Sequence, residues 1–182
     1  AATMSRIGKQ PIAIPSGVTV VSQGSQVTVK GKLGELTRVF QTGITVTVEN
    51  GQVLVSRADD SRLLKSCHGL SRTLIKNMIE GVTSGYKKVL NIEGTGFKAA
   101  LQGNKLSLSL GFASPKEYPI PAGIKVTVDN PGLNVTVEGI NKELVGEAAA
   151  RIRSYYPAEP YKGKGIKYVG EQVRRKQGKT VA

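Results

Sequence analysis

The sequence has little of what most enzymes use for catalysis. Its 182 residues include no tryptophan, one cysteine and one histidine. These two, Cys67 and His68, are neighbours, and neighbours on a helix point about 100° apart, which does not suit a thiol nucleophile and its base. We expect Cys67 in the core, on the apolar side of a helix, and His68 towards its basic face. One cysteine forms no internal disulfide, and this pair alone does not make a protein zinc site.

Paired carboxylates and a convincing cofactor motif are also missing. The one adjacent acidic pair, Asp59-Asp60, is explained by the start of a helix, where negative charge is favourable. The run Gly94-Thr-Gly-Phe-Lys-Ala is similar to a dinucleotide-binding fingerprint, but a turn and a strand follow it instead of the required helix. No apolar run is long enough to span a membrane, and no signal peptide is visible. We therefore predict a protein that is not an enzyme and has no metal, cofactor or membrane partner.

Lysine and arginine, by contrast, are abundant. They number 26 against 13 acidic residues, which gives a net charge of +13 and a pI near 10.0. Nine of the basic residues lie between Arg151 and the C-terminus, where only Glu159 and Glu171 are acidic. Charge gathered at one end of a chain indicates a surface that binds a polyanion. The glycines and tyrosines among these cations would allow close approach to a nucleic acid and stacking on its bases.

Two kinds of periodicity organise the first half. Alternating apolar and polar residues predict strands at residues 18–21, 26–30, 36–40, 44–48 and 52–56, with a hairpin turn at Asn50-Gly51. A helix follows, because apolar residues then recur at helical spacing. Its predicted apolar face consists of Leu63, Cys67, Leu70, Leu74 and Met78. Its predicted basic face consists of Arg62, Lys65, Arg72 and Lys76. That basic face is either solvated or a contact with RNA or protein.

The same pattern returns after about eighty residues. Residues 106–110, 121–128 and 134–138 match the strands near residues 27, 44 and 53, and a second helix ends before Pro157. We therefore predict an α+β fold with two tandem duplicated domains, each a small antiparallel sheet packed against one helix, and a basic C-terminal tail. The predicted limits are residues 1–82 and 83–157 for the domains and 158–182 for the tail.

One further loop has two interpretations. Gly31-Lys-Leu-Gly is similar to the G-x-x-G loop that joins two helices in single-strand-binding KH modules. Here it lies between two predicted strands, so we expect a hairpin turn, while an RNA contact by Lys32 stays open.

Four motifs follow one another along almost the whole chain. They are Ser5-Arg-Ile-Gly-Lys-Gln-Pro-Ile, Gly69-Leu-Ser-Arg-Thr-Leu-Ile-Lys-Asn-Met, Gly94-Thr-Gly-Phe-Lys-Ala, and Ala158-Glu-Pro-Tyr-Lys-Gly-Lys-Gly-Ile continued by Arg174-Arg-Lys-Gln-Gly-Lys. Together they resemble the bacterial and organellar type of the large-ribosomal-subunit protein six family (ribosomal protein uL-six). The Tyr-Lys-Gly-Lys-Gly run is highly specific for that family.

The resemblance implies two tandem α+β repeats and a non-enzymatic constituent of the large ribosomal subunit that supports translation. It also implies binding to large-subunit ribosomal RNA near the sarcin–ricin loop, beside the translation-factor site and neighbouring ribosomal proteins. The RNA-binding positions carried onto this chain are Tyr161, Lys162, Gly163, Lys164, Gly165, Lys167, Arg174, Arg175, Lys176 and Lys179. Arg153, near the end of the second predicted helix, is added to this set. We interpret the two glycines as places where the backbone fits against RNA, and the tail as a candidate for ordering on assembly.

Three places depart from the family's pattern, namely Ala158, Tyr155-Tyr156 and Phe112-Ala-Ser-Pro. Together with the residues before Met4, they favour a processed precursor and a chloroplast ribosome over a bacterial cytoplasm. The alternative function is a free nucleic-acid-binding or chaperone-like protein outside the ribosome. Sedimentation separates the two, because only a ribosomal protein should travel with the large subunit.

Overall fold

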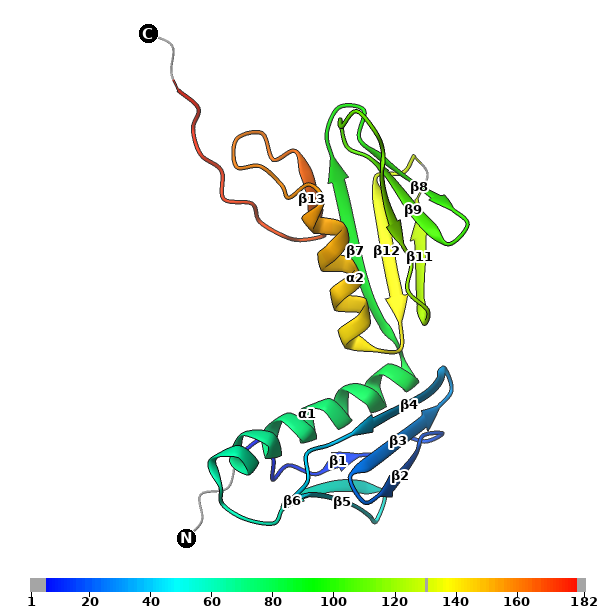
Figure 1. Ribbon diagram of the computed structural model, residues 1–182, viewed down its shortest axis with the longest axis vertical. Coiled ribbons are helices and arrows are strands. Elements are labelled where there is room, and N and C mark those ends of the chain that lie inside the picture. Colours follow the sequence, from blue (N-terminus) through cyan, green and yellow to red (C-terminus); the bar gives the residue numbers. More distant parts are fainter. Residues whose placement is uncertain (1–5, 130, 180–182) are drawn as a thin grey trace. The chain divides into compact units, whose positions relative to one another are not determined.

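The computed structural model describes residues 6–129 and 131–179 (Figure 1). Residues 1–5, which include Met4 and the start of the first motif, lie outside this part. The chain divides into two compact units. The first unit comprises the chain up to residue 85 together with 140–142, and the second comprises 86–139 and the chain from 143 onward. In the described part, no helix is both long enough and apolar enough to cross a membrane.

The first unit contains two antiparallel three-stranded sheets and one long helix (Figure 1). One sheet has the order β1-β6-β5 and the other the order β2-β3-β4. Between β5 and β6, Asn50 and Gly51 both have positive φ, as the predicted tight hairpin turn requires. The elements are β1 (Ile12–Ala13), β2 (Thr19–Gln23), β3 (Gln26–Gly31), β4 (Gly34–Val39), β5 (Ile44–Glu49), β6 (Gln52–Arg57) and α1 (Arg62–Thr83).

Helix α1 forms where it was predicted, but its buried face is rotated. Leu63 and Leu70, expected in the core, are 57% and 56% exposed. Cys67 is partly buried against the core. The helix begins after Ser61, whose hydroxyl accepts the amide of Leu64 at 3.3 Å. The side chains that α1 buries include Leu64, His68, Ser71, Ile75, Met78, Ile79 and Val82.

The expectation that His68 faces the basic side is wrong, because its ring is fully buried. Its Nε2 donates to the Val55 carbonyl at 2.9 Å, and its Nδ1 lies 3.4 Å from the Arg57 guanidinium. A carbonyl only accepts and a guanidinium only donates, so the proton resides on Nε2. A side chain at Gly8 would collide with this ring. The hydrogen-bonding partners Val55 and Arg57, which lie outside the helix, therefore allow the polar His68 to be buried.

The second unit also has two antiparallel sheets and one helix (Figure 1). A three-stranded sheet has the order β10-β9-β8, and a four-stranded sheet has the order β11-β12-β7-β13. The elements are β7 (Tyr86–Glu93), β8 (Lys98–Gln102), β9 (Lys105–Ser109), β10 (Lys116–Pro119), β11 (Ile124–Val128), β12 (Asn134–Gly139), α2 (Lys142–Ser154) and β13 (Gly165–Tyr168).

The duplication read from the sequence is visible in the strand order. The sheet β1-β6-β5 of the first unit has its counterpart in β7-β12-β11, and β2-β3-β4 corresponds to β8-β9-β10. The α+β fold class is therefore confirmed, with the strands of each unit divided between two sheets instead of one. Strand β13 has no counterpart among the described strands of the first unit, and it comes from the basic segment.

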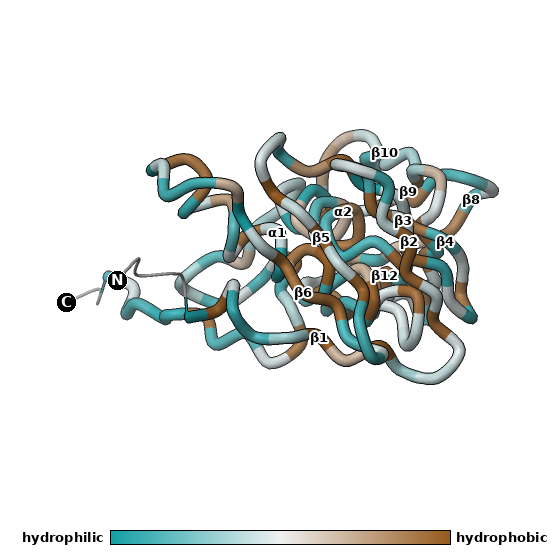
Figure 2. Tube along the Cα trace, turned by 90° about the horizontal axis from the view of Figure 1, so that it is seen from below, coloured by the Kyte–Doolittle hydropathy of each residue, from teal (hydrophilic) through white to brown (hydrophobic). Residues whose placement is uncertain are grey.

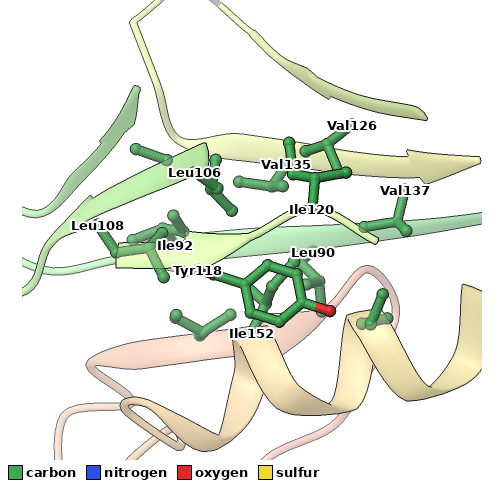
Figure 3. Packing of buried hydrophobic residues seen from close by; sticks show 14 of the residues in the cluster. Leu90, Ile92, Leu106, Leu108, Tyr118, Ile120, Val126, Val135, Val137 and Ile152 are labelled. Atoms are coloured by element: carbon green, nitrogen blue, oxygen red, sulfur yellow. The ribbon is translucent and has the colours of Figure 1, made fainter. Parts of the chain in front are cut away.

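Both units bury aliphatic side chains between sheet and helix. Along the strands, hydrophobic and hydrophilic residues alternate, as Figure 2 shows by colour. In the second unit, Leu90 and Ile92 of β7 meet Ile152 of α2, with Tyr118 of β10 beside them (Figure 3). Because Ile166 of β13 is fully buried in this same cluster, the basic segment is fastened to the core.

Candidate nucleic-acid interface

The segment predicted as a tail contributes a strand to the second unit. Strand β13 pairs antiparallel with β7, so that Gly165 lies opposite Glu93 and Tyr168 opposite Leu90. The sequence analysis did not predict this strand. Strand β13 fixes the chain on both sides of Ile166. The cations that precede and follow the strand are therefore held at defined places on the second unit.

A tight loop precedes β13 and carries the Tyr-Lys-Gly-Lys run; we call residues 159–164 the basic loop. Its ends are joined by the amide of Glu159, which donates to the Lys164 carbonyl at 2.8 Å. The Glu159 carboxylate accepts the amides of Tyr161 at 3.1 Å and Lys162 at 2.7 Å. Burial alone would raise the pKa of Glu159, but the hydrogen bonds from these amides and from Lys164 lower it below 4.5. The carboxylate is therefore ionised at neutral pH.

The chain after β13 returns to the basic loop. The amide of Lys176 donates to the Pro160 carbonyl at 2.8 Å, so residues 174–176 lie beside the loop. The Arg175 guanidinium lies against Gly163, where a Cβ would come within 3.0 Å of it. We call the basic loop together with residues 174–176 the basic surface. It brings into one region seven of the predicted positions, namely Tyr161, Lys162, Gly163, Lys164, Arg174, Arg175 and Lys176.

The two predicted glycines are both buried, and the chain itself explains them. Gly165 has φ +134°, and a Cβ there would lie 2.7 Å from the Ala158 Cα and the Pro157 carbonyl oxygen. Gly163 has φ +76° and lies under the Arg175 side chain. Since both backbone conformations are unfavourable for other residues, glycine is required for local packing before any RNA is considered.

Two of the predicted cations are balanced inside the second unit. Arg153 makes a two-pronged contact with the Glu171 carboxylate, with Nε donating to Oε2 at 3.1 Å. Glu171 also accepts the Tyr168 amide at 3.0 Å. Lys167 Nζ lies 2.6 Å from Glu93 Oε1 and is only 22% exposed. Arg153 and Lys167 thus hold the segment in place more than they present free charge.

Substituting Glu171 by glutamine is expected to destabilise the protein by about 1–2 kcal/mol, because the half-buried Arg153 loses a charge-assisted partner. The hydrogen bond from Arg153 lowers the pKa of Glu171 below 4.5. A carboxyl whose pKa is lowered by folding stabilises the native state above its unfolded value, and this contribution is lost as pH falls through the native value. Urea unfolding should therefore show a difference between variant and wild type at neutral pH that shrinks in acid.

The exposed ion pair of Glu147 with Arg151, at 2.9 Å on α2, supplies the control. Glu147→Gln should change the unfolding free energy by less than about 0.5 kcal/mol, since solvated pairs contribute little. Equal losses for both variants would contradict a special role for Glu171.

The remaining cations are free to meet a ligand. Lys162, Arg174, Lys176 and Lys179 are exposed and form no ion pair with any residue in the described part. Tyr161 is 55% exposed, so its ring is open to stacking. The same part of the chain holds no group of three His, Cys, Asp or Glu side chains that could bind a metal ion. Free cations beside an open aromatic ring could neutralise phosphates and stack on a base.

Sequence reasoning missed the two acidic residues that shape this surface. Glu159 and Glu171 were counted only as negative charges, and no structural role was predicted for either of them. Their signal was present in the sequence, because a carboxylate within a cationic segment weakens the attraction for a polyanion unless it fills a structural role. The sequence does not say which amides each carboxylate binds.

Comparison with known proteins gives a consistent result. Residues 14–85 and 93–169 both match the family described as Ribosomal protein L6, which reproduces the duplication. The chain is 54% identical to the large ribosomal subunit protein uL6 of Synechococcus sp. over 177 residues, or 97% of this chain and 98% of that protein. The protein of the same name from Gemmatimonas aurantiaca is also 54% identical, with the same coverage. That from Thermosynechococcus vestitus is 53% identical over 184 residues, covering 97% of this chain and 98% of the relative.

Proposed function

Because the chain belongs to the ribosomal protein L6 family, whose members are structural and non-enzymatic, we propose that it is a constituent of the large ribosomal subunit that binds large-subunit RNA. The observation that carries the proposal is the basic surface, where the returning chain places residues 174–176 beside the basic loop. In this proposal residues 1–82 and 83–157 are the scaffold, and 158–182 is the RNA-binding segment.

Phosphate neutralisation supplies most of the affinity in this proposal. Cations on a folded support can meet several phosphates at once, and each contact releases counterions from the RNA. Such contacts fix position and orientation, while the shape of the folded RNA and stacking of Tyr161 on an unpaired base give specificity. Arg153, Lys167, Gly163 and Gly165 contribute by holding the surface in shape.

We place the RNA site near the sarcin–ricin loop, beside neighbouring ribosomal proteins and the translation-factor site. The support is the family resemblance of the Tyr-Lys-Gly-Lys-Gly run, which forms most of the basic loop. The sequence departures at Ala158 and Phe112 support a chloroplast ribosome over a bacterial cytoplasm, whereas the similarity to cyanobacterial relatives fits both.

Sedimentation of ribosomes tests the proposal. A tagged form of the full chain should travel with the large subunit in moderate salt, and should stay with it when the two subunits are separated by removing magnesium. Recovery at the top of the gradient would instead favour the free nucleic-acid-binding or chaperone-like protein. The same gradient, run on purified chloroplasts and on whole-cell lysate of the source organism, assigns the compartment. Absence from the chloroplast ribosomes would contradict the plastid assignment.

A further inference from the structure

All four successive amides of the basic loop point at one residue. The Tyr161 amide donates to Glu159 Oε2, and the amides of Lys162 and Lys164 donate to Glu159 Oε1, the latter at 3.5 Å. The fourth amide, that of Gly163, donates to the Glu159 carbonyl at 3.1 Å. Glu159 thus receives every amide between residues 161 and 164.

Converging amides of this kind form an anion-binding concavity. Here the anion is the chain's own carboxylate, so the concavity is filled without any ligand. With the amides turned inward, Tyr161 and Lys162 are left on the outside, and both are exposed. The shape that presents these side chains is therefore already satisfied in the protein by itself.

We propose that Glu159 is a positioning residue that fixes the basic loop in its RNA-binding shape before RNA arrives. The inference rests on the proposed function, since it explains how that surface is held ready. A preformed loop loses less conformational entropy on binding than a loop ordered by the ligand, so affinity rises without a new contact.

Because Glu159 is negatively charged, the direction in which RNA affinity changes on its substitution tests this inference. A carboxylate beside bound RNA repels phosphates, so simple electrostatics predicts tighter binding when that charge is removed. If Glu159 positions the loop, removing its charge weakens binding instead. The two explanations therefore predict opposite changes in affinity for the same substitution.

The test compares Glu159→Gln with wild type. Glutamine keeps one carbonyl oxygen but turns a donor towards the loop amides, so the concavity is disrupted with little change in volume. On the free protein, hydrogen exchange of the amides of residues 161–164 should become about tenfold faster or more, because charge-assisted hydrogen bonds protect them. Affinity for a transcribed large-subunit RNA fragment that contains the sarcin–ricin loop should fall about threefold or more.

Glu147→Gln is the matched control. It raises the net charge by the same amount on the same unit, from an exposed side chain of α2. It should leave loop exchange unchanged and bind the RNA fragment as tightly as wild type, or slightly more tightly.

Faster exchange together with weaker binding by Glu159→Gln, but not by the control, supports the inference. Unchanged exchange overturns it, because the carboxylate then does not order the loop. Binding equal to or tighter than wild type also overturns it. Failure of the wild-type protein to bind the fragment at all would count against the proposed RNA site instead, and the exchange measurement would still decide whether Glu159 fixes the loop.

Discussion

Replacing Gly165 by alanine is expected to destabilise the protein by about 3 kcal/mol or more, because the substitution combines backbone strain with an unavoidable clash. The new Cβ would lie 2.7 Å from two backbone atoms of residues 157 and 158, and neither can move like a flexible side chain. Relief requires β13 and residues 157–158 to move apart, which would weaken the hydrogen bond from the Ile166 amide to the Tyr156 carbonyl. Urea unfolding of the free protein measures the loss.

Gly170→Ala separates strain from clash. Gly170 has φ +85°, and a Cβ there would meet nothing within 4 Å, so only the backbone penalty of about 1–2 kcal/mol applies. Gly163→Ala should fall between the two, because the atom in its way is the movable end of Arg175. If Gly165→Ala were no less stable than Gly170→Ala and yet failed to enter ribosomes, close approach of RNA would be the better explanation of this glycine.

Neutralising the basic surface should have the largest effect on RNA binding. We expect substitution of six cations by glutamine to lower affinity for the sarcin–ricin-loop fragment at least about a hundredfold near 0.1 M salt. Each lost phosphate contact should also flatten the slope of log affinity against log salt by about 0.7–0.9. The residues are the five cations of the basic surface, Lys162, Lys164, Arg174, Arg175 and Lys176, together with the exposed Lys179. Lys167 is kept, because its pair with Glu93 supports β13.

The control removes the same charge from the first unit. Both sets lower the formal net charge from +13 to +7. The control residues, all exposed, are Lys9, Lys30, Lys32, Arg62, Lys65 and Lys76. This set should change the affinity far less and leave most of the salt slope intact. Equal losses of RNA affinity for both sets would mean that total charge, and not the basic surface, governs binding. The basic face of α1 and Lys32 would then again be candidates for RNA contacts.

Local periodicity predicted most of the fold. Strands with alternating side chains bury one face, and that pattern identified the repeat and many of its strands through residues such as Val27, Leu106 and Val135. It did not reveal that each unit divides its strands between two sheets. The orientation of α1 could not be found this way. Of the predicted apolar stripe, Leu63 and Leu70 are exposed, while His68 is held inside by its contacts with Val55 and Arg57. A helical stripe shows which residues share a side, but partners far along the chain decide which side is buried.

The candidate site was found by composition and resemblance, and its internal organisation was not. Charge density pointed to the segment, because net charge needs no knowledge of contacts, and RNA binding by this segment stays a prediction. Strand β13 could not be predicted from local sequence pattern, since its four residues pair with β7 more than seventy residues earlier. For the same reason, the sequence suggested only an RNA contact for Gly165, whereas the structure supplies a local one with the backbone of Pro157 and Ala158. The RNA contact of Gly165 stays a prediction.

The pairing of β13 with β7 has a consequence for the newly made protein. A sheet that ends in an unpaired strand offers open amides and carbonyls to other chains, and this invites aggregation. Residues 165–168 cover the side of β7 left free by β12, and on the outer side of β13 the Ile166 amide is bound by the Tyr156 carbonyl. This edge therefore offers fewer open groups while the protein is still without its ribosome. A chain cut at Pro160 would lose this cover along with its cations. Its precipitation or poor yield would then reflect an uncapped sheet as much as a missing RNA ligand.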